Sequence, residues 1–196
     1  MSEKMRCGWC LSHKTLIDYH DAEWGVPVHD DRHLFEMLIL EGAQAGLNWL
    51  TVLKKRVGYK LAFDNFEAQK IVHYDQNKIS NLQQDSRIIR HKLKILSVLK
   101  NARRFLQIQE EYGSFDKFIW QFVDGKTILN KYKNSSRIPA TSKESDRMSR
   151  ALKKRGFSFV GPTICYAYMQ GTGMVNDHTT DCFRWSELNF LAPNQK

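Results

Sequence analysis

The stretch "ALKKRGFSFVGPTICYAYMQ" (151–170) predicts two helices joined by a tight turn. A capping box of Thr141 and Glu144 would begin the first helix, and Gly156 suits its C-terminal end because glycine tolerates the left-handed conformation common there. Gly161 as the N-cap and Pro162 as the first helical residue would begin the second helix. We therefore expect a helical hairpin over about residues 142–171.

The turn of this hairpin is a candidate phosphate site. Backbone amides at the N-terminus of the second helix have no partner within the helix, and Lys153, Lys154 and Arg155 precede the turn. An ordinary capped hairpin with a solvated basic end explains the same residues about equally well.

Apolar residues recur at helical spacing through the rest of the chain, and the alternation typical of strands is almost absent. We predict an all-α fold, with further helices over 32–42 behind the acidic caps Asp30 and Asp31, from about Asp75, over 88–108, and over 114–123 behind Ser114. The spacing in 88–108 predicts an inward face of Leu93, Leu96, Ala102 and Phe105, and an outward face of Arg90, Lys94 and Arg103. The polar stretch 124–139 is expected to be a flexible loop.

Length and charge limit the classes of protein that remain. A chain of 196 residues fits a single domain, over 1–196, and 30 Lys plus Arg against 21 Asp plus Glu give a formal charge of +9. This balance attracts polyanions and makes nucleic acid the leading partner class. The chain has neither an apolar run of about 18 residues nor the apolar stretch of a secretory signal, so we expect a cytoplasmic protein without a membrane partner.

Cysteine and histidine near both ends of the chain suggest a metal site. The N-terminal "RCGWC" (6–10) lacks the strand expected before a redox dithiol, while "HTTDC" (178–182) places His178 and Cys182 on adjacent turns. With Cys7 they supply three ligands of the type that zinc prefers, and the fourth is either Cys10, which spacing slightly favours, or His20. Buried apolar cysteines and a hydrogen-bonded surface histidine are the alternative.

Glu41 is a carboxylate on the apolar face of the predicted 32–42 helix. Several aromatic residues lie near it or in the N-terminal segment: Trp9, Tyr19, Trp24 and Trp49. A carboxylate among aromatic rings suits a planar cationic ligand. A salt-bridged helix end explains Glu41 about as well, and core packing is the more common role of single tryptophans.

Six blocks of the chain, in order from about residue 6 to 182, together resemble 3-methyladenine DNA glycosylase type I, bacterial enzymes of the helix-hairpin-helix superfamily. The blocks are "RCGW", "YHDAEWGVP", "LFEMLILEGAQAGLNWLTVLKKR", "IIRHKLKI", "ALKKRGFSFVGPTICYAYMQ" and "VNDH". Because six motifs occur in the same order, the resemblance is far more specific than any one of them.

The resemblance implies a function and a set of site residues. It implies a monomeric enzyme that flips 3-methyladenine out of alkylated double-stranded DNA and excises it hydrolytically, without strand cleavage, since no lysine stands out as a Schiff-base nucleophile. The implied zinc ligands are Cys7, His20, His178 and Cys182, in place of Cys10, with about 6–30 and 172–185 forming an annex around one structural zinc. The implied base-recognition carboxylate is Glu41, and the implied base pocket is Trp9, Tyr19, Trp24 and Trp49. The implied DNA contacts are Gly46 and Leu47 in a loop that probes the duplex, and Lys153, Lys154, Gly156, Gly161 and Thr163 at the hairpin.

Three positions depart from the pattern of the family or superfamily. Leu16 stands where a tyrosine is expected, three residues before Tyr19, and Phe159 stands where the hairpin often has a glycine. Asn176 occupies the place of an aspartate that many superfamily members use near the sugar, with Asp177 adjacent. A non-catalytic zinc-stabilised DNA-binding module and a zinc hydrolase are the competing classes; the first has no use for Glu41, and the second would need an open zinc position.

Overall fold

The protein, as a computed structural model, is described over residues 4–191, and this part is almost entirely helical. The α-helices are α1 (Lys14–Ala22), α2 (Asp31–Gln44), α3 (Trp49–Ala62), α4 (Ala68–Ile71), α5 (Gln76–Gln84), α6 (Lys92–Tyr112), α7 (Phe115–Trp120), α8 (Lys143–Lys154), α9 (Pro162–Gly171) and α10 (Phe183–Leu191). Short 3-10 helices cover Gly8–Cys10, Asp64–Phe66, Gln121–Val123 and Ser135–Arg137. The all-α prediction is confirmed. The predicted single domain over 1–196 includes residues 1–3 and 192–196, which lie outside the described part.

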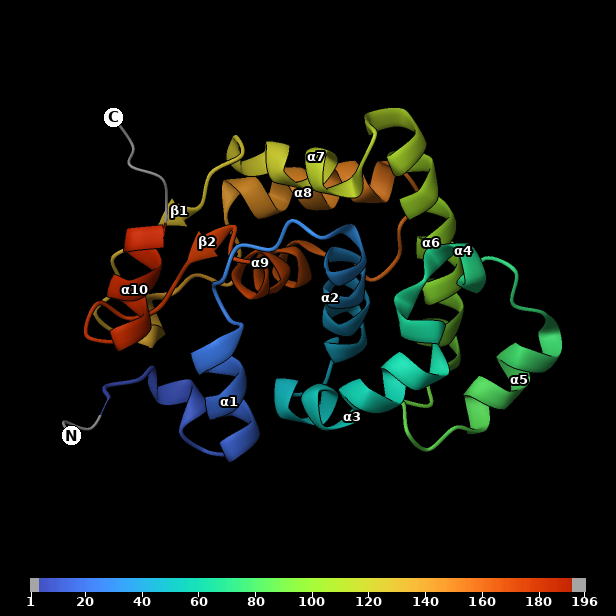
Figure 1. Ribbon diagram of the computed structural model, residues 1–196, viewed down its shortest axis with the longest axis horizontal. Helices are drawn as coiled ribbons and strands as arrows, with labels where there is room; N and C mark the ends of the chain where they lie inside the picture. The colour runs from blue at the N-terminus through green and yellow to red at the C-terminus, as the bar shows by residue number, and fades with distance from the viewer. Residues whose placement is uncertain (1–3, 192–196) are drawn as a thin grey trace.

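Helix α2 is the centre of the fold and contacts α3, α6, α7 and α9 (Figure 1). Asp30 caps it by accepting a hydrogen bond from the His33 amide at 2.8 Å, as its sequence predicted. All residues from Leu34 to Ala43 are buried, so α2 has no solvent face for most of its length. Glu41 is thereby buried in the middle of the molecule.

Figure 1 shows α1 and α10 at one end of the molecule and α5 and α6 at the other. The N-terminal segment and α10 lie at the same end, so residues far apart in sequence meet there. None of the described helices combines the length and the apolar character needed to span a membrane.

The predicted helices at Asp75, 88–108 and Ser114 correspond to α5, α6 and α7, with Asp75 and Ser114 as caps. Helix α6 begins four residues later than predicted and extends to Tyr112, and α7 ends at Trp120, where a 3-10 helix follows. The predicted faces of α6 are wrong at two neighbouring positions. Leu93 is 63% exposed, whereas Lys94 is only 9% exposed and donates to the carbonyl oxygens of Ala43 and Ala45 at 2.8 and 2.6 Å. Hydrogen bonds to another helix therefore override the apolar pattern in the first turn of α6.

The predicted hairpin is confirmed as α8, a turn, and α9, with a shift of one residue at its start. Ser142, rather than Thr141, is the N-cap, and it forms the capping box with Ser145 rather than with Glu144. Gly156 has φ +86° directly after the C-cap of α8, and Gly161 caps α9 with Pro162 as its first residue.

The stretch 124–139, predicted to be a loop, contains one strand of the only strand pair found between residues 4 and 191. The strands β1 (Ile128–Leu129) and β2 (Val175–Asn176) pair in parallel, with Ile128 opposite Val175. Two-residue strands are too short to produce an alternating pattern, so the sequence could not predict them. The pairing fixes the stretch beside the residues that follow α9.

Candidate active site and metal centre

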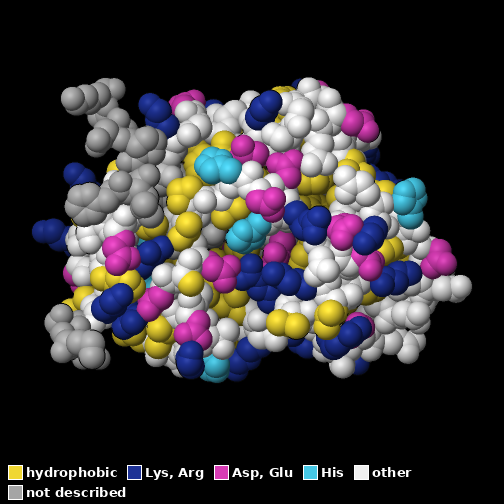
Figure 2. Space-filling view, viewed as in Figure 1, with side chains coloured by type: hydrophobic (Ala, Val, Ile, Leu, Met, Phe, Trp, Pro, Cys, Tyr) yellow, Lys and Arg dark blue, Asp and Glu magenta, His cyan; other side chains and the backbone are white. Residues whose placement is uncertain are grey.

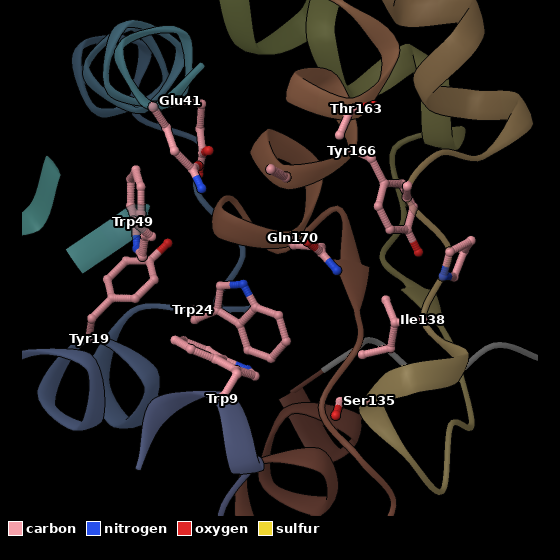
Figure 3. A pocket seen from close by; sticks show the side chains of 14 residues that line it. Trp9, Tyr19, Trp24, Glu41, Trp49, Ser135, Ile138, Thr163, Tyr166 and Gln170 are labelled. Atoms are coloured by element: carbon pink, nitrogen blue, oxygen red, sulfur yellow. The ribbon is translucent and has the colours of Figure 1, made fainter. Parts of the chain in front are cut away.

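A cavity of about 380 Å³ lies between α1, α2, α9 and the segment that precedes α8 (Figure 3). All five residues predicted for the base-recognition site line it, and they come from separate elements of the fold: Trp9, Tyr19, Trp24, Glu41 and Trp49. The structure therefore brings together residues that lie up to 40 positions apart in the chain. Leu16 is buried but does not line this cavity.

Glu41 lies at the wall formed by α2 and is 3% exposed. Its Oε2 atom is buried without a hydrogen-bond partner among the described residues, and burial raises the pKa of its carboxyl group to about 8. Helix α9 passes closely, since a Cβ atom at Gly171 would lie 2.9 Å from Met37 Cε and 3.4 Å from Glu41 Oε1. An unpaired buried carboxylate is costly and indicates a ligand that supplies its missing partner.

Aromatic rings form the walls next to Glu41. The centroids of Trp9 and Trp24 lie 5.0 Å apart at 72°, and those of Tyr19 and Trp49 lie 5.4 Å apart at 59°. Trp9 Nε1, Tyr19 Oη and Trp49 Nε1 are also buried without partners in the described part of the chain. Three unsatisfied donors and an unsatisfied carboxylate around one cavity suit a flat polar ligand that carries positive charge.

The opposite wall was not predicted from the sequence. It comprises Ser135, Ile138, Pro139, Ala140, Thr163, Tyr166, Ala167 and Gln170, and Gln44 of α2, which lines the cavity beside Glu41, was not predicted either. The four residues from α9 recur at i, i+3, i+4 and i+7, so the face of this helix was detectable, whereas the contribution of residues 135–140 depends on the tertiary fold. Thr163, which the resemblance implied as a DNA contact, therefore also lines the cavity.

Asp177 and Asn176 are both buried and do not line the cavity. The Asp177 carboxylate accepts hydrogen bonds from Asn130 Nδ2, Tyr166 Oη and Gln170 Nε2 at 2.6, 2.7 and 2.8 Å. The Asn176 side chain donates to Asn189 Oδ1 at 3.1 Å and accepts from the His178 amide at 3.2 Å. Asp177 thus orients two cavity residues, and Asn176 supports the backbone near His178.

The predicted DNA contacts lie on two exposed turns. Gly46, with φ +76°, and Leu47, 43% exposed, lie between α2 and α3. Lys153 and Lys154 are exposed at the end of α8. On the face shown in Figure 2, basic and acidic side chains are interspersed, so the excess positive charge does not form one uniform surface there.

Phe159 occupies the hairpin position where a glycine was expected. Its φ is +57°, a left-handed conformation that favours glycine, and a Cβ atom at Gly42 would lie 3.2 Å from Phe159 Cβ. The turn therefore packs directly against the helix that carries Glu41.

Cys7, His20, His178 and Cys182 form one buried cluster, whose ligand atoms all lie within 4.8 Å of one another. His20 Nε2 lies 3.1 Å from His178 Nδ1, Cys182 Sγ lies 3.4 and 3.5 Å from these two nitrogens, and Cys7 Sγ lies 3.6 Å from His178 Nδ1. Tetrahedral zinc with ligand bonds of about 2.0–2.3 Å holds its ligand atoms about 3.3–3.8 Å apart. The residues fit such an ion in both donor type and spacing.

The other nitrogen of each histidine also has a partner. His20 Nδ1 lies 2.8 Å from Asp21 Oδ1, and His178 Nε2 lies 3.0 Å from the Trp24 carbonyl oxygen. Such contacts fix the ring and tautomer of histidine ligands. Cys10 lies outside the cluster and donates its thiol hydrogen to the Cys7 carbonyl at 3.1 Å, which argues against the ligand that spacing alone favoured.

The helical fold, the aromatic cavity with its buried carboxylate and the hairpin fit the glycosylase family that the sequence resembles, and comparison with known proteins tests that family. A family model described as methyladenine glycosylase matches residues 9–185. DNA-3-methyladenine glycosylase 1 of Escherichia coli K12 is 47% identical over 90% of this chain and 95% of its own length. DNA-3-methyladenine glycosylase of Haemophilus influenzae is 45% identical over 90% of this chain and 96% of its own. The solved structure of 3-methyladenine DNA glycosylase I from Staphylococcus aureus superposes with a TM-score of 0.89 at 32% identity, covering 97% and 98% of the two chains. The chain belongs to the methyladenine glycosylase family.

Proposed function

We propose that this protein is a DNA repair glycosylase that flips 3-methyladenine out of alkylated double-stranded DNA and hydrolyses its N-glycosidic bond without cutting the strand. The observation that carries the proposal is the buried carboxylate of Glu41, which has no hydrogen-bond partner for Oε2 in the described part of the chain and lies beside aromatic rings in a cavity of about 380 Å³. The names of its relatives, 45–47% identical over 90% of the chain, support the same activity.

The leaving group explains why binding can supply most of the catalysis. Methylation at N3 makes the adenine cationic while it is attached to deoxyribose, so bond cleavage expels a neutral base and needs little acid assistance. Glu41 would accept a hydrogen bond from the exocyclic amine and attract the positive charge. The faces of Trp9, Tyr19, Trp24 and Trp49 would add cation–π attraction.

Water would attack the sugar C1′ atom without a dedicated aspartate at the sugar. Asn176 is neutral. Asp177 does not line the cavity, and its carboxylate is already occupied by three hydrogen bonds, two of them from the lining residues Tyr166 and Gln170. The enzyme should therefore act only on bases that are both weakly bonded to the sugar and well bound in the cavity.

The DNA interface would have two parts. The hairpin would contact phosphates, and the probing loop (45–48) would insert into the duplex. The amides between Gly156 and Thr163 and the side chains of Lys153 and Lys154 would hold the backbone. Gly46 and Leu47 would enter the gap left by the extruded nucleotide, which costs a few kcal/mol to flip. The chain would act as a monomeric single domain.

The Cys7, His20, His178 and Cys182 cluster would hold one structural zinc and join about 6–30 to 172–185. All four coordination positions would be filled by protein, so the ion would stabilise the fold rather than activate water. The tethered segment carries Trp9, Tyr19 and Trp24, so the metal would indirectly support the cavity.

The test is to incubate the protein with methylated DNA and identify the bases released. 3-Methyladenine should be released, and Glu41→Ala should reduce its excision strongly while changing duplex binding little. 7-Methylguanine is the informative control, because it is also cationic but presents a carbonyl oxygen to Glu41, at a cost of about 1–3 kcal/mol for the unpaired acceptors. Equal release of 7-methylguanine or hypoxanthine by the wild type would contradict the role of Glu41 as the discriminating group.

A further inference from the structure

One buried face of α6 contacts both turns to which the proposed function assigns DNA binding. Lys94 and Asn101 lie seven residues apart on this helix, hence on the same side and about 10 Å apart along its axis. They are 9% and 2% exposed. Long buried polar side chains need partners, and in both residues the partners are backbone groups of a DNA-facing turn.

Lys94 holds the end of α2 and the start of the probing loop. Its ammonium group donates to the Ala43 carbonyl in the last turn of α2 and to the carbonyl of Ala45, the C-cap residue that directly precedes Gly46. A cation is favoured at these carbonyls because they carry the negative end of the helix dipole. No carboxylate of residues 4–191 forms an ion pair with Lys94, so the buried charge is compensated by this turn.

Asn101 holds the hairpin turn through both ends of its amide. Its Nδ2 group donates to the Ser158 carbonyl at 3.0 Å, and its Oδ1 atom accepts from the Ser158 amide at 2.8 Å. The next residue is Phe159, whose left-handed backbone conformation is unfavourable for a residue with a side chain. A two-point clamp beside that residue fixes a turn that would otherwise relax.

We propose that Lys94 and Asn101 are positioning residues, and that α6 acts as a rigid strut that sets the spacing between the probing loop (45–48) and the hairpin turn (155–161). The inference rests on the proposed function, because it takes these turns as the parts that enter the duplex and hold its phosphates. Base extrusion needs both actions on one duplex at once, so a loop displaced relative to the hairpin reduces extrusion without altering the cavity.

The first experiment compares Lys94→Met with Lys100→Met, an exposed lysine of the same helix, in the full-length zinc-loaded protein. Single-turnover release of 3-methyladenine at saturating enzyme should fall roughly tenfold to a hundredfold in Lys94→Met, the scale of a loss from misplaced groups, and should not change in Lys100→Met. Binding of free 3-methyladenine, followed by tryptophan fluorescence, should be unchanged in both. A duplex with the lesion opposite an abasic site, where the base is already unpaired, should restore most of the missing rate.

The second experiment separates the two ends of the strut. Asn101→Leu should weaken binding of damaged and undamaged duplex alike. It should also lower excision at saturating enzyme, because the hairpin is then displaced relative to the probing loop, while free-base binding stays at the wild-type level. If Lys94→Met does not fold, Lys94→Gln is measured in its place, because glutamine keeps a shorter hydrogen-bond donor. Its excision rate should fall less, and the duplex with the lesion opposite an abasic site should again restore most of the missing rate.

The proposal is overturned if the Lys94 variant excises at the wild-type rate, if free-base binding falls in proportion to excision, or if the unpaired lesion gives no recovery. It is also overturned if Asn101→Leu leaves duplex affinity unchanged. Failure of the proposed function looks different, because the wild type itself would then neither bind free 3-methyladenine nor release it.

Discussion

The burial of Glu41 shows how a residue needed for binding can lower the stability of the fold. Its Oε2 atom is buried without a hydrogen-bond partner among residues 4–191, and burial raises the pKa of the carboxyl group to about 8. The folded protein therefore favours the neutral acid, whereas the proposed ligand needs the carboxylate. The cation itself would supply the missing charge, so binding and ionisation of Glu41 should be coupled.

The free energy of unfolding should fall with pH because of this residue. Since the pKa of Glu41 is higher in the folded protein than in the unfolded chain, the folded state binds more protons between about pH 4.5 and pH 8, and stability decreases as pH rises through this window. From pH 6 to pH 9 the loss should be roughly 2–3 kcal/mol. Chemical denaturation of wild type and Glu41→Gln at each pH measures the difference, which should grow with pH in favour of the variant. A difference independent of pH would contradict the burial of an ionisable Glu41.

Catalysis should increase as pH rises, whereas stability should decrease. The value of kcat/KM reports ionisation in the free enzyme, so it should rise with pH up to about 8, where Glu41 becomes charged. The value of kcat should reach its plateau at lower pH, because the bound cation lowers the pKa of Glu41. Steady-state excision from methylated duplex across pH 6–9 measures both profiles. Glu41→Gln is the control, and its kcat/KM should lack the rise.

The sequence predicted where helices begin more reliably than which residues their side chains contact. Caps such as Asp30, Asp75 and Ser114 are local, and the structure confirms them. Lys94 was predicted on the wrong face because its partners are carbonyls of α2, some 50 residues earlier in the chain. The capping box moved from Thr141 to Ser142 because both residues can cap and only the fold selects between them.

The cavity residues also divide into those that sequence motifs could indicate and those that only the tertiary fold brings together. The resemblance implied Trp9, Tyr19, Trp24, Glu41 and Trp49, and all of them line it. Residues 135–140 were missed because only the tertiary fold brings them to the cavity. The segment before them pairs with β2, and two-residue strands leave no pattern in the sequence.

The hairpin should contribute to DNA affinity but not to base selection. Reversing Lys153 and Lys154 to glutamate should weaken binding of damaged and undamaged duplex alike, and the slope of log affinity against log salt should fall by about one unit for each phosphate left without a lysine partner. Fluorescence anisotropy with both duplexes at several salt concentrations measures this. Lys92 and Lys100, exposed on α6, allow a control of equal charge reversal. A weakening confined to the damaged duplex would instead connect Lys153 and Lys154 to the cavity.

One buried cluster links the N-terminal and C-terminal parts of the chain. It comprises Cys7, His20, His178 and Cys182. Cys7 and Cys182 are 175 positions apart in sequence, yet their side chains share one buried cluster. Closing so long a loop removes much conformational entropy from the unfolded chain, so a metal bound there should stabilise the fold as a whole. The cavity residues Trp9 and Trp24 also pack on this cluster, since the Trp9 and His20 centroids lie 5.6 Å apart and those of Trp24 and His178 lie 4.6 Å apart.

Zinc loss should therefore lower stability and base binding together. We expect about one zinc per chain by elemental analysis, and Cys182→Ser should lose the metal and several kcal/mol of unfolding free energy, since removing a partner from a buried cluster leaves polar groups unsatisfied. Cys10→Ser is the matched control: Cys10 is equally buried and close in sequence to Cys7, but it donates only to a carbonyl, so the metal should remain. His20→Ala should behave like Cys182→Ser and should also weaken binding of free 3-methyladenine, because Trp9 and Trp24 lose their support. Retention of zinc in His20→Ala combined with its loss in Cys10→Ser would show that the fourth ligand is Cys10.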